Sequence, residues 1–269
     1  YTKVRYLSSK LIVIERQEAN GERINAIIDT TAKIVLPFSS KIATIELIDG
    51  HIIVSQKSEN GQLLYGIIDY EGQIMLPIEY EQLRGINKGY LARKNGKLGI
   101  INLQNKWLVP AIYDTIEVLF ANDNNYYLGT INKKYYLINN VYQLITPTPY
   151  DNITQVEIPY FFRTHPIIPQ LKDNEYFIVW RDDKKGLIDK QGKELISPNL
   201  IYDKIIPRTD GYYNIIQWKE QVDYWGLISP EGKLLVAPRS LSPIEIAGKM
   251  FVSTEVVSYP SSDDTTKKV

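Results

Sequence analysis

A pattern that returns six times along the chain restricts its fold more than any other feature. Each copy has paired apolar residues, one polar residue, a short turn, a second apolar run and a proline. The polar residues are Asp29, Asp69, Asn102, Asn139, Asp189 and Ser229, so the spacings are 40, 33, 37, 50 and 40 residues. The prolines follow eight or nine residues later, at Pro37, Pro77, Pro110, Pro147, Pro198 and Pro238. A constant offset over six copies indicates a repeat protein.

Each copy predicts a β-hairpin. The paired apolar residues are rich in β-branched side chains, which favour strands. The polar side chain after them can cap the backbone N–H groups of a tight turn. Three positions later the turn needs a positive φ, and this position holds Gly72, Asn105, Gly192 and Gly232. We expect the second strand, for example 33–36, to end at the proline, because proline has no N–H group to donate.

Further strands are predicted around each hairpin. Four Tyr-acid pairs mark the start of a third strand with a buried tyrosine: Tyr80-Glu81, Tyr113-Asp114, Tyr150-Asp151 and Tyr202-Asp203. Another strand comes before most hairpins, at 11–15, 51–55, 89–93, 126–130, 175–179, 212–216 and 250–253. A unit of about 40 residues with about four short strands is typical of a propeller blade.

The predicted fold is therefore all-β, with six degenerate β-hairpin repeats of about 40 residues. The repeats form either a propeller-like ring or an open curved β-repeat array. We expect one repeat domain over 1–257 and a disordered polar tail over 258–269. The expected repeats lie near 11–50, 51–88, 89–125, 126–174, 175–211 and 212–257.

The repeat unit resembles that of the bacterial WG-repeat proteins, also called KWG repeats. That unit reads roughly Trp-Gly-aliphatic-Ile-Asp, two variable residues, Gly-Lys, aliphatic residues, Pro and then Tyr-Asp. Trp225-Gly226 is the one literal signature pair. The glycine without the tryptophan occurs at Tyr65-Gly66, Leu98-Gly99 and Lys185-Gly186, and both are replaced at Asn25-Ala26 and Tyr135-Tyr136. The resemblance implies a repetitive β scaffold that mediates binding, and it brings no catalytic residues.

Composition excludes several classes of function. Lys plus Arg and Asp plus Glu both number 31, whereas nucleic-acid-binding proteins normally carry a basic excess. Cysteine is absent, so thiolate metal sites and disulfides are excluded. The two histidines, His51 and His165, have no partner at metal-ligand spacing, and His51 is expected to be a hydrogen-bonded surface residue. No apolar run reaches the length of a membrane span, and no cofactor is implied.

The best candidate for a binding element is the longest interruption of the repeat, at 155–175. This segment is rich in proline and aromatic residues, which suits a rigid binding loop, although its phenylalanines could instead cap a blade. Trp218 and Tyr212 are further candidates, because exposed aromatic side chains suit recognition of proteins or sugars. The candidate partner-binding residues are Tyr160, Phe161, Phe162, Arg163, His165, Ile167, Tyr212 and Trp218.

We expect a non-enzymatic scaffold that binds another protein, such as a toxin or a cell-envelope component. One concrete form is an antagonist or immunity protein that occludes the active site of a bacterial toxin. One alternative is a module that binds glycan or cell-wall polymer. The other is a divergent glycosidase-like propeller that uses Asp29, Asp69 and Asp189, although Asn and Ser fill the same position in other copies and favour turn capping. The chain starts at Tyr1, and a periplasmic or otherwise exported bacterial protein is slightly favoured over a cytoplasmic one.

Overall fold

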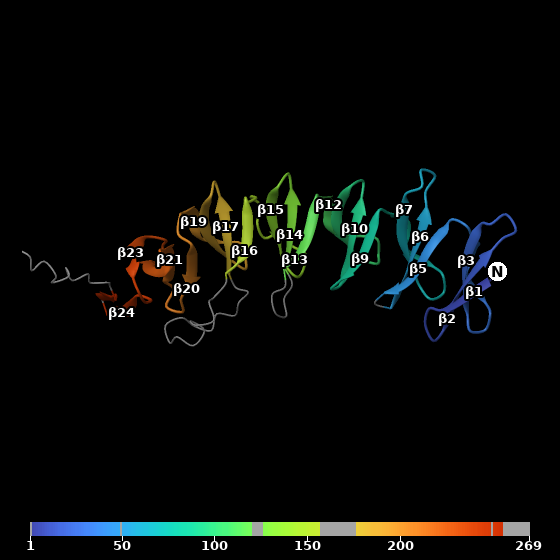
Figure 1. Ribbon diagram of the computed structural model, residues 1–269, viewed down its shortest axis with the longest axis horizontal. Coiled ribbons are helices and arrows are strands. Elements are labelled where there is room, and N and C mark those ends of the chain that lie inside the picture. Colours follow the sequence, from blue (N-terminus) through green and yellow to red (C-terminus); the bar gives the residue numbers. More distant parts are fainter. Residues whose placement is uncertain (1, 49, 120–125, 157–175, 249, 255–269) are drawn as a thin grey trace, which may run out of the picture. The chain divides into compact units, whose positions relative to one another are not determined.

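The computed structural model describes residues 2–48, 50–119, 126–156, 176–248 and 250–254. Within these ranges all the regular elements are β-strands, and neighbouring strands in each sheet are antiparallel wherever their pairing is defined (Figure 1). The described part of the chain contains no helix of the length and apolarity that a membrane crossing requires. The prediction of an all-β repeat fold is confirmed.

Two compact units divide the chain. The N-terminal unit comprises residues 1–118, 127–132 and 141–143. It contains three four-stranded sheets in which consecutive strands are neighbours. The first sheet has β1 (Thr2–Tyr6), β2 (Leu11–Gln17), β3 (Arg23–Asp29) and β4 (Ile34–Ser39). The second has β5 (Ile42–Ile48), β6 (His51–Lys57), β7 (Leu63–Ile68) and β8 (Ile74–Tyr80). The third has β9 (Gln82–Ile86), β10 (Gly89–Lys94), β11 (Lys97–Ile101) and β12 (Trp107–Tyr113).

The C-terminal unit comprises residues 119–126, 133–140 and 144–269. Its two four-stranded sheets have the same strand order, and a two-stranded sheet follows them. The fifth sheet has β16 (Asn152–Gln155), β17 (Tyr176–Arg181), β18 (Lys184–Asp189) and β19 (Glu194–Leu200). The sixth has β20 (Lys204–Pro207), β21 (Tyr213–Lys219), β22 (Val222–Ile228) and β23 (Leu234–Ser240). The seventh has β24 (Glu245–Ala247) and β25 (Met250–Val252).

The fourth sheet has three strands, β13 (Thr115–Leu119), β14 (Tyr126–Ile131) and β15 (Lys134–Ile138), and its residues are divided between the two units. After β15 only isolated bridges form, between Tyr135 and Tyr150 and between Ile138 and Leu144. The segment that would form the fourth strand carries Pro147 and Pro149. Pro147 is the repeat proline, which lies inside the outer strand of the other sheets, so this copy differs by Pro149, a second residue without an N–H group, and by Tyr136 in place of the repeat glycine.

The boundaries of the sheets differ from those of the expected repeats by one strand. Each sheet begins with the strand before the one at which the expected repeat begins. The seven strands expected before the hairpins correspond to β2, β6, β10, β14, β17, β21 and β25. The strands expected after the Tyr-acid pairs become the first strands of the following sheets, namely β9, β13, β16 and β20. β1 was not predicted, because no copy of the repeat precedes it. The expected tail at 258–269 lies outside the described residues.

The predicted turn chemistry is confirmed. In the second sheet the Asp69 carboxylate accepts hydrogen bonds from the N–H groups of Glu71 and Gln73, at 3.0 and 2.7 Å. The same pair of bonds forms at Asp29, Asn102, Asp189 and Ser229. Three positions later φ is positive in all six copies, at Ala32, Gly72, Asn105, Tyr142, Gly192 and Gly232. The polar side chain therefore satisfies backbone donors that a tight turn leaves free.

The sequence predicted that the proline ends the second strand of the hairpin, and this prediction is wrong. The proline lies inside the outer strand, within a bulge, and pairing resumes beyond it. In the third sheet Ile100 pairs with Val109 and Leu98 with Tyr113, so Pro110, Ala111 and Ile112 oppose the single residue Gly99. An edge strand tolerates proline at a bulge, because no ladder hydrogen bond is lost there.

The glycine of the repeat makes room for this bulge. A Cβ atom at Gly99 would lie 2.6 Å from the Val109 carbonyl oxygen and 2.7 Å from the Ala111 nitrogen. The same conflict with outer-strand backbone occurs at Gly66, Gly186 and Gly226. Each of these glycines opposes three residues of the outer strand. In the first sheet Ala26 replaces the glycine, and only Pro37 and Phe38 oppose it.

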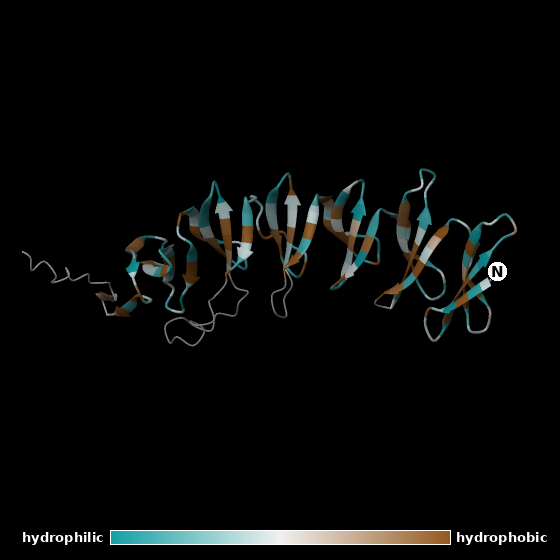
Figure 2. Ribbon diagram, viewed as in Figure 1, coloured by the Kyte–Doolittle hydropathy of each residue, from teal (hydrophilic) through white to brown (hydrophobic). Residues whose placement is uncertain are grey.

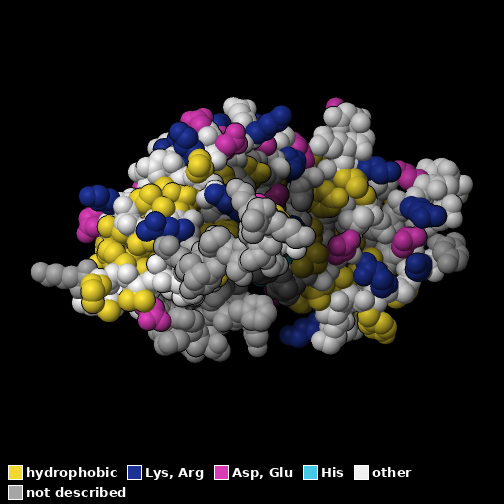
Figure 3. Space-filling model, turned by 60° about the vertical axis from the view of Figure 1, so that its left-hand side comes forward, with side chains coloured by type: hydrophobic (Ala, Val, Ile, Leu, Met, Phe, Trp, Pro, Cys, Tyr) yellow, Lys and Arg dark blue, Asp and Glu magenta, His cyan; other side chains and the backbone are white. Residues whose placement is uncertain are grey.

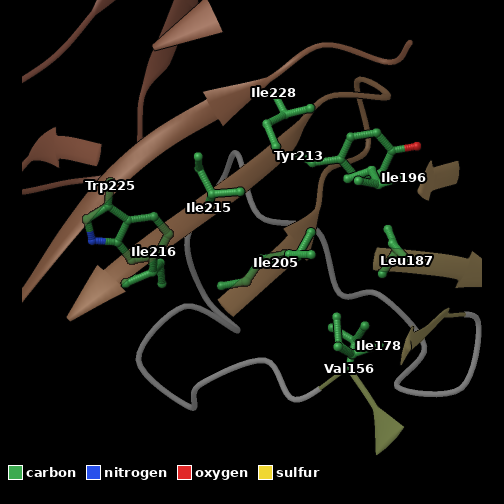
Figure 4. Packing of buried hydrophobic residues seen from close by; sticks show 11 residues of the cluster. Val156, Ile178, Leu187, Ile196, Ile205, Tyr213, Ile215, Ile216, Trp225 and Ile228 are labelled. Carbon is green, nitrogen blue, oxygen red and sulfur yellow. The ribbon is translucent and has the colours of Figure 1, made fainter. Parts of the chain in front are cut away.

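Apolar residues of consecutive sheets pack against each other. In the N-terminal unit, Val13 and Ile27 of the first sheet join Ile45, Ile52 and Val54 of the second in one buried cluster. In the C-terminal unit a larger cluster joins the fifth and sixth sheets and includes Trp225 (Figure 4). Figure 2 shows hydrophobic residues along the strands and hydrophilic residues at the hairpin turns. Because no single sheet buries both of its faces, stability comes from the contacts between successive repeats.

Hydrogen bonds and ion pairs connect successive sheets, and both residues of the Tyr-acid pair take part in them. The acidic residue of the Tyr-acid pair accepts a hydrogen bond from the next sheet, as in Asp114 with the Asn132 N–H at 2.8 Å and Asp151 with the Asp182 N–H at 2.8 Å. Lys97 and Lys134 form ion pairs with the same two carboxylates. The buried Tyr80 donates its hydroxyl proton to the Asn105 side chain at 2.6 Å. Tyr113 and Tyr150 are also buried, as the sequence predicted.

We predict that Gly99→Ala lowers the free energy of unfolding by about 2 kcal/mol, because the new methyl group meets backbone atoms that cannot move aside. The matched control is Ala26→Gly at the equivalent position of the first sheet, which should cost less than about 1 kcal/mol. Urea denaturation of both variants measures the difference. Equal losses in the two variants would show that the glycine is not required by the bulge.

A second prediction concerns alkaline pH. Burial, helped by the nearby Glu79 carboxylate, raises the pKa of Tyr80 from 10.0 to about 12. The folded state therefore holds this proton more tightly than the unfolded state. The corresponding contribution to stability is complete below about pH 10 and is lost as the pH rises through about 12. Melting temperatures between pH 8 and pH 12 should fall less steeply in Tyr80→Phe, whereas Tyr6→Phe, at an exposed side chain, should follow the unchanged chain. Identical slopes for Tyr80→Phe and the unchanged chain would contradict the assignment.

Candidate functional site

Six of the eight predicted partner-binding residues lie outside the described residues: Tyr160, Phe161, Phe162, Arg163, His165 and Ile167. The remaining two lie near opposite ends of β21. Tyr212 precedes the strand and is half-buried, and its N–H donates to the Asp210 carboxylate. Trp218 is the penultimate residue of the strand and is 61% exposed. The two residues are six positions apart along an extended strand, a distance of roughly 20 Å, so they do not form one site.

Trp218 is more exposed than six other aromatic residues of the strands. Tyr126, Tyr127, Tyr213 and Trp225 are buried in sheet packing, and Tyr135 and Tyr136 are half-buried. The Trp218 backbone is fixed, because its N–H donates to the Asp203 carboxylate at 2.6 Å. This bond is equivalent to the Asp114 and Asp151 links described above. A rigid backbone therefore presents a largely exposed indole ring.

Lys185 and Ile201 lie near Asp203, the residue whose carboxylate accepts the Trp218 N–H. The Lys185 ammonium donates to the Asp203 carbonyl oxygen at 2.7 Å and lies 5.9 Å from the centre of the Trp180 ring. Ile201 is 73% exposed and is two residues from Asp203, hence within about 7 Å of it along the backbone. We call Lys185, Ile201, Asp203 and Trp218 the Trp218 surface. Figure 3 shows that hydrophobic side chains form groups on the face of the molecule that it draws.

A change of register explains why Ile201 is exposed. In the second and third sheets the tyrosine of the Tyr-acid pair ends the outer strand and pairs with the residue before the repeat glycine. In the fifth sheet Leu200 takes that pairing with Lys185, so Tyr202 is not the structural equivalent of Tyr113. The extra residues Ile201 and Tyr202 lie beyond the strand end. Tyr202 packs partly against the core cluster, and Ile201 points out of it.

The sequence identified only Trp218 of this surface. By its place in the repeat, Lys185 replaces the signature tryptophan, and Asp203 belongs to a Tyr-acid pair that predicts the start of a strand. The signal for Ile201 was the longer distance from Asp189 to Tyr202, 13 residues compared with 11 from Asp69 to Tyr80. The three carboxylates considered for glycoside hydrolysis, Asp29, Asp69 and Asp189, all accept backbone hydrogen bonds in turns. The Thr31 hydroxyl and nearby N–H groups lower the pKa of Asp29, which favours a turn-capping role.

No group of three or more metal-ligating side chains occurs in the part of the chain that the structure describes. His51 accepts or donates a hydrogen bond with the Tyr90 hydroxyl at 2.8 Å, and the two rings meet edge to face. This contact fits the predicted surface role of His51. The Trp218 surface includes two exposed apolar side chains, Trp218 and Ile201, and the Lys185 ammonium group, a combination that suits recognition.

Solved structures that align with most of this chain have low sequence identity to it and low TM-scores. A protein of unknown function from Bacteroides caccae is 14% identical, with 85% of this chain and 93% of that chain covered and a TM-score of 0.22. AztD from Citrobacter koseri is 12% identical, covering 87% and 70%, with a TM-score of 0.30. TolB from Acinetobacter baumannii is 13% identical, covering 86% and 64%, with a TM-score of 0.26. Likenesses this distant say nothing about function.

Comparison with curated protein sequences gives no significant match. The family model described as "WG containing repeat" matches three segments, residues 65–97, 99–135 and 186–215. Two of these segments begin at the repeat glycine, and the first begins one residue before it. The resemblance that the sequence suggested is confirmed over these three segments, which match the WG repeat.

Proposed function

We propose that this chain is a non-enzymatic β-repeat scaffold that binds another protein through the Trp218 surface. The observation that carries the proposal is an indole ring that is 61% exposed on a backbone held by a 2.6 Å hydrogen bond. A rigid aromatic side chain loses little conformational entropy on binding, and tryptophan is enriched among the residues that dominate binding energy.

The neighbours of Trp218 support a protein as the partner. Ile201 adds a large aliphatic side chain, 73% exposed, which gains from burial against apolar protein surface. Lys185, which is bonded to the Asp203 carbonyl oxygen, supplies a positive charge that can pair with a partner carboxylate. An apolar centre with a charged rim is the usual organisation of a protein interface.

The finer form of the proposal is an antagonist or immunity protein that covers the active site of a toxin. A set of β-sheets packed through regular contacts gives a surface that changes little on binding, which suits an inhibitor. The predicted binding segment at 155–175 is the second part of the proposed interface, and its residues 157–175 lie outside the described ranges. The glycan-binding alternative remains tied to the same indole ring, because sugars also stack on exposed tryptophan.

A photo-crosslinking experiment tests the proposal. The photoreactive amino acid p-benzoylphenylalanine replaces Trp218 in the full chain, and the protein is irradiated in an extract of the organism that encodes it. We expect one abundant protein adduct. In the purified complex Trp218→Ala should then weaken binding about 30-fold, corresponding to about 2 kcal/mol, with an unchanged melting temperature.

The matched control carries the same photoreactive residue at Ile74, which is 66% exposed in the N-terminal unit. No protein adduct at Trp218, or the same adducts at both positions, would contradict the proposal. A glycan array on which the unchanged chain binds and Trp218→Ala does not would favour the glycan-binding alternative instead.

A further inference from the structure

A cavity of about 430 Å³ lies between the first two sheets of the N-terminal unit. Lys3 and Arg5 of β1, Glu15 of β2, Asn25 of β3, and Thr44 and Glu46 of β5 supply its polar lining. Val13 and Ile45 form its apolar base and belong to the core cluster between these sheets. Its volume is within the range of small-molecule sites.

The cavity lies where other repeats place a large side chain. Asn25 takes the position before the repeat glycine, which holds Tyr65 in the second sheet and the buried Trp225 in the sixth. The cross-strand row through this position in the first sheet consists of Lys3, Glu15, Asn25 and Ser39. The equivalent row in the sixth sheet consists of Lys204, Ile216, Trp225 and Ser240. In the sixth sheet the Trp225 side chain fills the space at this position. In the first sheet the smaller Asn25 leaves the space open, and charged side chains line it.

Hydrogen bonds hold the walls of the cavity. The Arg5 guanidinium donates to the Ile45 carbonyl oxygen at 2.8 Å, and the Asn25 amide donates to the Ile42 carbonyl oxygen at 2.9 Å. Both bonds join the first sheet to β5, so the two sides of the cavity keep their separation. The site is therefore formed before any ligand arrives, which lowers the entropic cost of binding.

The charges in the cavity are balanced. Lys3 and Arg5 lie two residues apart on β1, on the face toward the second sheet, and Glu15 and Glu46 approach from β2 and β5. Among the described residues no hydrogen bond or ion pair involves the charged ends of Lys3, Glu15 or Glu46. A ligand with a single charge would pair either with the two basic side chains or with the two carboxylates, and it would leave the other two groups without a partner.

We propose that this cavity binds a small zwitterion, a molecule of amino-acid or dipeptide size with one carboxylate and one ammonium group. The carboxylate lies against Lys3 and Arg5, and the ammonium group against Glu15 and Glu46. The Thr44 and Asn25 side chains provide polar contacts between the two ends. This site is separate from the Trp218 surface, and its test does not depend on the protein-binding proposal.

Calorimetric titration of the full chain with L-alanyl-L-alanine tests the proposal. We expect a dissociation constant at or below about 1 mM. N-acetyl-L-alanyl-L-alanine, which lacks the ammonium group, and L-alanyl-L-alanine amide, which lacks the carboxylate, should each bind at least tenfold more weakly. No binding of the free dipeptide at about 10 mM, or equal binding of all three probes, would overturn the proposal.

Two variants locate the binding within the cavity. Asn25→Tyr installs the residue of the second sheet and should abolish binding by filling the space. Glu15→Gln keeps the shape, removes one charge and should weaken binding at least tenfold, so it remains informative if Asn25→Tyr perturbs folding. Glu59→Gln, at an exposed position in the loop between β6 and β7, is the matched control and should bind as the unchanged chain does. Unchanged binding by both cavity variants would place the ligand elsewhere and contradict the proposal.

Discussion

The close approach of the outer strand to the repeat glycine is the interaction on which the sheets depend. Where glycine is present, three outer-strand residues including proline bulge over it, and backbone atoms come within 2.5–2.7 Å of where a Cβ atom would be. Where Ala26 replaces glycine, the bulge loses one residue. Where Tyr136 replaces it, the outer strand forms isolated bridges only. The larger the side chain at the glycine position, the more the pairing of the outer strand departs from a ladder with a three-residue bulge.

The residue before the repeat glycine differs from sheet to sheet, and the sheet forms whichever residue is present. Trp225 is buried at this position, Tyr65 packs partly into the core, Asn25 opens a cavity and Lys185 reaches the Asp203 carbonyl oxygen beside Trp218. Both proposed sites therefore arise where the tryptophan of the repeat has been lost. A repeat that keeps its turn, glycine and bulge can change this position without losing its sheet.

Much of the fold could be predicted from the sequence, because turn chemistry and strand periodicity are local. The Asp69 turn and the positive φ at Gly72 follow from a few adjacent residues. The path of the outer strand could not be predicted, because a bulge depends on which residue lies opposite Pro110, and that is set by pairing across the sheet. The shift that exposes Ile201 was missed for the same reason. Of the candidate site, Trp218 could be identified as an aromatic residue outside the repeat pattern, whereas its neighbours come from other strands.

A double-mutant cycle in the third sheet tests the link between the glycine and the bulge most directly. One variant is Gly99→Ala, the second deletes Ala111, and the third combines both changes to copy the first sheet, where Ala26 opposes two residues. If the methyl group and the third bulge residue compete for one space, the combined variant should be more stable than the sum of the single losses predicts, by about 1–2 kcal/mol. Additive losses would contradict the account, because the glycine and the bulge would then act independently.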